Sequence, residues 1–147
     1  MKYFSLLFCL FFSLQMMKAQ EISKSYFKTT QEINSFTEDV MNSLSKNKIT
    51  NAYSILRMKW IIPENELDQL ESQTIKNFNL MESRYGKAKS YEFVKDQKIG
   101  NTVMRKVYLL KFDYHYITFL FTYYNNGEGW LLNSYKFSDE IETAFEN

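Results

Sequence analysis

The sequence has 147 residues, with 18 basic and 17 acidic side chains and a formal net charge of +1. This length suits one domain with a proper hydrophobic core. Because basic and acidic residues are nearly balanced, the chain lacks the excess of positive charge that binding to nucleic acids or anionic lipids requires. Abundant aromatics (13 Phe and 11 Tyr) exclude an intrinsically disordered chain. We therefore expect a single folded domain that does not bind nucleic acid.

Residues 1–19 have the features of a secretory signal peptide. Lys2 is followed by an uncharged apolar run that ends at Leu14. This run is shorter than the roughly 20 apolar residues that span a bilayer, so a signal peptide is favoured over a retained membrane anchor. Ala19 provides the small residue that a signal peptidase needs, and a weaker alternative site lies at Ser13. We expect cleavage after Ala19.

Cleavage there leaves residues 20–147 as one domain of 128 residues, exported to the periplasm or the medium of a bacterium and not attached to a membrane. Cys9 is the only cysteine and leaves with the signal, because Phe8 replaces the small residue that precedes a lipid-attachment cysteine. The mature domain then has no disulfide, no thiolate metal ligand and no cysteine nucleophile. Losing Lys2 and Lys18 leaves 16 basic and 17 acidic residues, a net charge of about −1.

The first half of the domain predicts three helices. Thr29 and Glu32 form a capping-box pattern, which is typical of a helix start. Apolar residues on one face follow it at Ile33, Phe36, Val40 and Leu44. A second, shorter helix is expected from Thr50. The third begins at Pro63 and ends at Gly86. Its apolar face consists of Leu67, Leu70, Thr74, Phe78, Met81 and Tyr85.

The second half predicts four consecutive antiparallel strands, over residues 91–100, 103–112, 116–124 and 130–137. Residues 125–129, with the sequence Asn-Asn-Gly-Glu-Gly, form a hairpin turn signal. Residues 138–147 are expected to contain a short helix. Helices followed by an antiparallel meander define an α+β domain.

Apolar side chains occupy both faces of the third predicted strand. Phe119, Phe121 and Tyr123 lie on one face, and Tyr116, Leu120 and Tyr124 lie on the other. Three helices cover only one face of such a sheet. We therefore expect either a sheet that curls strongly around the helices or a homodimer that packs through the outer sheet face.

This element order resembles the nuclear transport factor 2-like superfamily of cystatin-like α+β domains, especially its small exported members in Bacteroidetes bacteria. The resemblance rests on Ala19-Gln20, on Gly129-Trp130-Leu131-Leu132 and on Tyr135-Lys136-Phe137-Ser138-Asp139. It implies a cone-like domain in which a curved four-stranded sheet wraps around the helices, and dimers that form through the sheet. The superfamily contains isomerases, dehydratases and non-enzymatic binding modules, so the resemblance leaves the function open.

Four aromatic residues are candidates for lining a ligand pocket between the helices and the sheet: Trp60, Tyr108, Trp130 and Tyr135. Their hydroxyl and indole N–H groups would orient a small apolar or aromatic ligand. The alternative is that these side chains pack in the core and their polar tips reach the backbone or solvent.

Catalytic candidates are few. Asp113 and His115 would make an acid/base pair if they shared a face, and otherwise they form a solvated turn. Glu92 and Asp96 have the same strand parity and are expected to face water, and Glu128 lies in a turn. We expect no cofactor and no metal site.

The sequence thus favours a non-catalytic domain that binds a small apolar or aromatic ligand or a protein partner. The alternative is an enzyme with an acid in the cone, doing proton transfer or dehydration.

Overall fold

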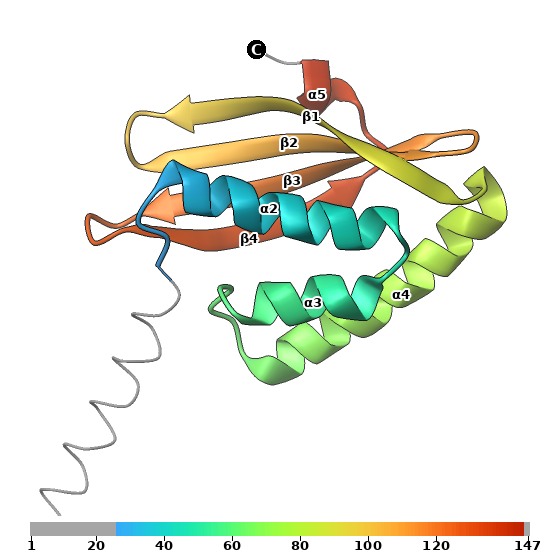
Figure 1. The fold of residues 1–147 in the computed structure, drawn as a ribbon, viewed down its shortest axis with the longest axis horizontal. Helices are drawn as coiled ribbons and strands as arrows, with labels where there is room; N and C mark the ends of the chain where they lie inside the picture. The colour runs from blue at the N-terminus through green and yellow to red at the C-terminus, as the bar shows by residue number, and fades with distance from the viewer. Residues whose placement is uncertain (1–25, 146–147) are drawn as a thin grey trace, which may run out of the picture.

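A computed structural model describes residues 26–145 (Figure 1), so the predicted signal peptide lies outside the described residues. The described chain runs through three helices, four strands and a last helical turn. In order they are α2 (Thr30–Ser45), α3 (Ile49–Arg57), α4 (Glu64–Tyr85), β1 (Ala88–Ile99), β2 (Val103–Phe112), β3 (Tyr116–Asn125), β4 (Trp130–Ser138) and α5 (Glu142–Phe145). The predicted α+β class with an antiparallel sheet is confirmed.

The four strands form an open antiparallel sheet in the order β1-β2-β3-β4, so β1 and β4 are its edges. β2 and β3 pair without a register shift, from Val103 opposite Tyr124 to Lys111 opposite Tyr116. β1 carries two irregularities, one of which lies between Phe93 and Lys95. None of the helices in residues 26–145 is long and apolar enough to cross a membrane.

Local signals account for most helix ends. Thr29 is the N-cap of α2, and its hydroxyl accepts a hydrogen bond from the backbone N–H of Glu32 at 3.1 Å, as the capping-box pattern predicts. Gly86 ends α4 with φ of +80°. A side chain at that position would also collide with Asp113, so both the backbone angle and the available space require glycine.

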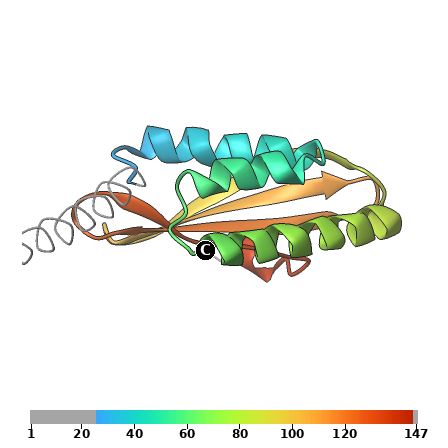
Figure 2. The ribbon, with the colours of Figure 1, turned by 90° about the horizontal axis from the view of Figure 1, so that it is seen from below.

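Helices α2 and α3 lie side by side on one side of the strands (Figure 2). The sheet surface beneath the helices is called the helix face, and the opposite surface the outer face. Strands β2 and β3 bury an aromatic and aliphatic layer around Lys106 on the helix face. Its members are Met104, Tyr108, Leu110, Phe112, Ile117, Phe119, Phe121 and Tyr123. This layer forms the sheet side of the hydrophobic core.

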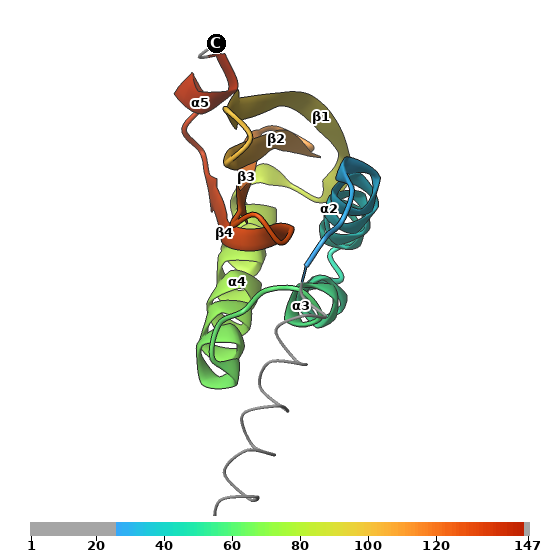
Figure 3. The same ribbon diagram turned by 90° about the vertical axis from the view of Figure 1, so that its left-hand side faces the viewer.

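The outer face is partly covered by the chain itself. Val107 and Thr118 are buried although they belong to this face. Helix α5 contacts β2, and Figure 3 shows α5 on the side of the sheet away from α2. The C-terminal segment therefore returns across the outer face. The sequence did not indicate this cover, and packing against a second copy stays a prediction.

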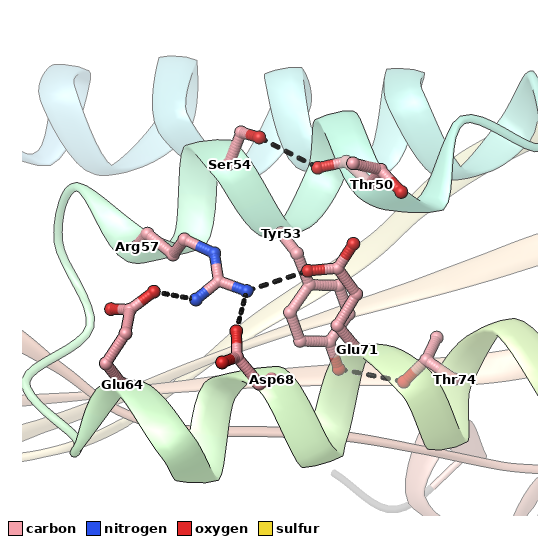
Figure 4. A network of polar contacts seen from close by, with 8 residues as sticks. All are labelled: Thr50, Tyr53, Ser54, Arg57, Glu64, Asp68, Glu71 and Thr74. Carbon is pink, nitrogen blue, oxygen red and sulfur yellow. Dashed lines mark hydrogen bonds and ion pairs between the residues drawn. The ribbon is translucent and has the colours of Figure 1, made fainter.

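Helix α4 is long but sparsely buried, with only Leu67, Thr74 and Phe78 fully inside. Leu70, which the periodicity placed on the inner face, is exposed. At the start of α4, ion pairs to α3 supplement this limited apolar contact (Figure 4). Arg57 of α3 forms ion pairs at 2.8 Å with both Asp68 and Glu71, and a third with Glu64. This cluster fixes α3 against α4.

Candidate functional site

The space between the helices and β4 is filled by aromatic rings. Tyr135 is only 8% exposed. The rings around it, with centroids at 5.2 to 6.3 Å, are Tyr53, Trp60, Phe119, Phe121 and Phe137. Such a cluster is a packed core in which edge and tilted contacts add to apolar burial. A ligand in this region would have to displace these rings.

The four predicted pocket residues do not converge on one space. Trp60 and Tyr135 are neighbours, with ring centroids 6.1 Å apart. Tyr108 is buried beneath α2, where its hydroxyl donates to Glu38 at 3.0 Å. Trp130 lies at the start of β4, where its backbone exchanges two hydrogen bonds with Phe27. The structure brings only the first two together.

Two polar atoms in this aromatic core have no hydrogen-bond partner in the described part of the chain. They are the indole Nε1 of Trp60 and the hydroxyl of Tyr135. Burial raises the pKa of Tyr135 well above its ordinary value, so this hydroxyl stays protonated. An unpaired buried hydroxyl lowers stability relative to an apolar group of the same shape.

Removing the Tyr135 hydroxyl is therefore expected to leave the protein as stable as the parent, or up to about 1 kcal/mol more stable. Tyr108→Phe is the matched change, because it removes a hydroxyl that donates to Glu38. We expect Tyr108→Phe to lower the free energy of unfolding by about 1–2 kcal/mol. Urea denaturation measures both. Equal losses in the two variants would show that the Tyr135 hydroxyl has a partner after all.

A carboxylate on α2 binds two tyrosines of the sheet. Glu38 accepts hydrogen bonds from the hydroxyls of Tyr91 at 2.6 Å and Tyr108 at 3.0 Å. Burial, and then the hydrogen bond to Glu38, raises the pKa of Tyr91 to about 12. Burial, and then the negative charge of Glu38, raises the pKa of Tyr108 as well. Both tyrosines are therefore neutral donors at physiological pH, and they tie α2 to β1 and β2.

A buried ion pair lies on the same face. The Lys106 ammonium is 2.8 Å from Asp96, with the Lys106 side chain 2% exposed and that of Asp96 32% exposed. The ammonium also lies 5.3 Å from the ring centroid of Phe93. The prediction that Glu92 and Asp96 share a face is wrong. A bulge between Phe93 and Lys95 places Asp96 opposite Lys106, whereas Glu92 ion-pairs with Lys111.

These polar groups already form hydrogen bonds or ion pairs with one another. Glu38 is held by two tyrosines, and Asp96 neutralises Lys106. General acid/base catalysis needs a group within hydrogen-bond reach of a substrate, and Tyr108 is fully enclosed. In residues 26–145, no group of three or more metal-ligating side chains is close enough to hold a metal ion. The cluster is therefore best explained as an attachment of α2 to the sheet.

The predicted Asp113–His115 pair is split between different partners. Asp113 accepts a hydrogen bond from the backbone N–H of Lys87 at 2.8 Å and ion-pairs with Lys89 at 2.6 Å. Lys89, followed by the Lys87 N–H, lowers the pKa of the Asp113 carboxyl. The ring of His115 packs on Tyr85, with centroids 4.2 Å apart. Asp113 therefore stabilises the turn between α4 and β1.

A surface groove of about 410 Å³ lies between α2 and α3. Phe27, Phe36, Ile55 and Met58 supply its apolar walls. Met58 is 62% exposed, and its unbranched side chain adapts to different neighbours. The polar residues around the groove are Gln31, Glu32, Ser35, Asp39 and Lys59. We refer to this feature as the α2–α3 groove.

The rim of the α2–α3 groove is net acidic. Glu32 and Asp39 contribute two carboxylates against the single Lys59. Lys59 is already engaged, since its ammonium donates to the backbone carbonyl of Tyr26 at 3.3 Å and lies 4.9 Å from the centroid of Phe27. An apolar floor with an acidic rim is complementary to an apolar side chain flanked by basic ones.

Comparisons with models of protein families, with curated proteins and with solved structures found no match for this chain.

Proposed function

We propose that this chain is an exported, non-catalytic binding domain whose binding surface is the α2–α3 groove. The occupant we propose is a segment of a protein partner that presents an apolar side chain between basic ones. One contrast carries the proposal: aromatic side chains fill the interior around Tyr135, whereas the groove exposes Met58 beside acidic residues. Recognition at the surface fits this arrangement better than enclosure of a substrate.

The proposed architecture is nuclear transport factor 2-like, and the three helices before a four-stranded meander support it. Export rests on the apolar run after Lys2 and on the small residue Ala19. Edman sequencing of protein collected outside the cytoplasm is expected to start at Gln20. A start at Met1 would contradict cleavage of a signal peptide.

The groove is tested with a short fluorescein-labelled peptide in which leucines alternate with lysines. Asp39→Lys reverses one rim charge and is expected to weaken peptide binding about tenfold, or about 1.4 kcal/mol. Met58→Ser removes an apolar wall and is expected to weaken binding several-fold. Fluorescence polarisation measures both effects.

Glu66→Lys is the matched control, because it makes the same charge reversal at an exposed position of α4 that is not among the residues lining the groove. It is expected to leave peptide binding within about twofold of the parent value. A peptide with glutamates in place of the lysines is expected to bind much more weakly. If Asp39→Lys and Glu66→Lys had the same effect, only the net charge would matter and the groove assignment would fail.

A second candidate function is an enzyme of proton transfer or dehydration, and the observation that favours it is the Glu38 carboxylate between two tyrosine hydroxyls. The enclosed position of Tyr108 opposes it. Incubation with simple ketones in D₂O measures proton transfer directly. Deuterium exchange that is faster with the parent protein than with Glu38→Gln would establish the enzyme and contradict our proposal.

A further inference from the structure

A second hollow lies at the β1–β2 hairpin, remote from the α2–α3 groove in the sequence. Its volume is about 400 Å³, and its lining residues are Asp96, Gln97, Lys98, Ile99, Val103 and Arg105. It forms where β1 ends and β2 begins, with Ile99 directly opposite Val103 in the ladder. We refer to it as the hairpin hollow.

The charge available in the hairpin hollow is positive. Lys98 and Arg105 are both exposed, and within residues 26–145 neither side chain makes a hydrogen bond or an ion pair. The carboxylate of Asp96 is neutralised by the Lys106 ammonium at 2.8 Å. Arg105 belongs to the same sheet face as Ile99 and Val103, whereas Lys98 pairs with Met104 on the helix face, as Asp96 pairs there with Lys106. One exposed cation, Arg105, therefore lies beside the apolar residues of the hollow.

The apolar part of the hollow is unusually exposed. Ile99 has 74% of its surface accessible. Val103 is its partner across the ladder and is itself paired with Tyr124, another exposed apolar side chain. An apolar strip thus continues from the hollow across neighbouring strands. A ligand with an apolar body would remove this strip from water.

We propose that the hairpin hollow binds a small organic carboxylate with an apolar body. The planar guanidinium of Arg105 suits a carboxylate because it donates two parallel hydrogen bonds. Ile99 and Val103 accommodate the apolar body. Inorganic anions lack that body and neutral amphiphiles lack the charge, so each class satisfies only half of the site. This inference does not depend on the function proposed for the α2–α3 groove.

The test is calorimetric titration of residues 20–147 with octanoate, octanamide and inorganic phosphate. We expect saturable octanoate binding that is at least about tenfold tighter than that of either control ligand. Arg105→Gln is expected to weaken octanoate binding about five- to tenfold, and Ile99→Ser several-fold. Lys98→Gln removes a charge on the opposite sheet face and is expected to leave binding within about twofold of the parent value. Lys76→Gln, which removes one exposed positive charge from α4, is expected to have no such effect.

Thermal unfolding confirms that each variant is folded before titration. Because two independent variants change the hollow, the test remains valid if one of them fails to fold. Three outcomes overturn the proposal: octanoate binding that does not saturate at millimolar concentration, octanamide or phosphate binding as tight as that of octanoate, or octanoate affinity unchanged in both Arg105→Gln and Ile99→Ser. The peptide titration of the α2–α3 groove is read separately, so the two proposals fail independently.

Discussion

Replacing Phe78 with alanine is expected to lower the free energy of unfolding by about 3–5 kcal/mol. Phe78 is fully buried, and its ring lies 6.3 to 6.4 Å from those of Phe112, Phe119 and Phe137. It is also one of only three fully buried residues of α4, a helix of 22 residues. Truncation therefore removes a large share of the apolar contact between α4 and the sheet and leaves a cavity.

Leu80→Ala is the control for this change, because Leu80 lies on the same helix with 69% of its surface exposed. We expect it to alter the free energy of unfolding by less than about 0.5 kcal/mol. Urea denaturation gives both values, and hydrogen exchange shows whether the amides of α4 lose protection first. A loss below about 1 kcal/mol for Phe78→Ala would mean that other contacts hold α4.

The second large effect is expected at the buried ion pair, and it is asymmetric. Asp96→Ala leaves the nearly inaccessible Lys106 ammonium without its carboxylate. Removing one partner of a buried pair costs about 3–5 kcal/mol, and the partial exposure of Asp96 reduces our expectation to about 2–3 kcal/mol. Lys106→Met instead leaves Asp96, which water reaches. We expect Lys106→Met to cost less than about 1.5 kcal/mol.

The double variant Asp96→Ala/Lys106→Met separates the charge effect from packing. Its stability is expected to lie closer to that of Lys106→Met than to that of Asp96→Ala, because no unpaired charge remains. Urea denaturation of the parent and the three variants completes a double-mutant cycle. Equal losses from the two single changes would contradict the view that Lys106 depends on Asp96.

Local patterns in the sequence predicted most of the architecture. The Thr29–Glu32 capping box marked the start of α2, and Gly86 marked the end of α4. The predicted second strand, residues 103–112, has the bounds of β2. Such signals depend on residues within a few positions of one another, so they can be recognised without knowledge of the fold.

Features that depend on contacts between distant segments were not predicted. The bulge between Phe93 and Lys95 moves Asp96 to the helix face, and alternation alone gives no sign of an inserted residue. Trp60 follows α3 and forms a parallel bridge with Leu132 of β4, a contact that spacing along the chain does not indicate. Helix α3 begins at Ile49 without a side-chain cap, one residue before the expected Thr50.

The two surface hollows were missed for the same physical reason. Phe27, Phe36 and Ile55 come from the segment before α2, from α2 and from α3, and only packing of these elements creates the groove. Spacing between Ile55 and Met58 was the available signal, since residues three apart share a helix face. The sequence instead predicted a binding site at aromatic residues of the interior, where the rings pack against one another.

The most direct test of the binding proposal is an amide chemical-shift map of the mature domain during titration with the leucine–lysine peptide. We predict saturable shifts at Phe36, Ile55 and Met58, with Tyr135 and its neighbours on β4 unchanged. Shifts centred on Tyr135 would show that the interior accepts ligands, and the absence of any saturable shift would remove the α2–α3 groove as the binding surface.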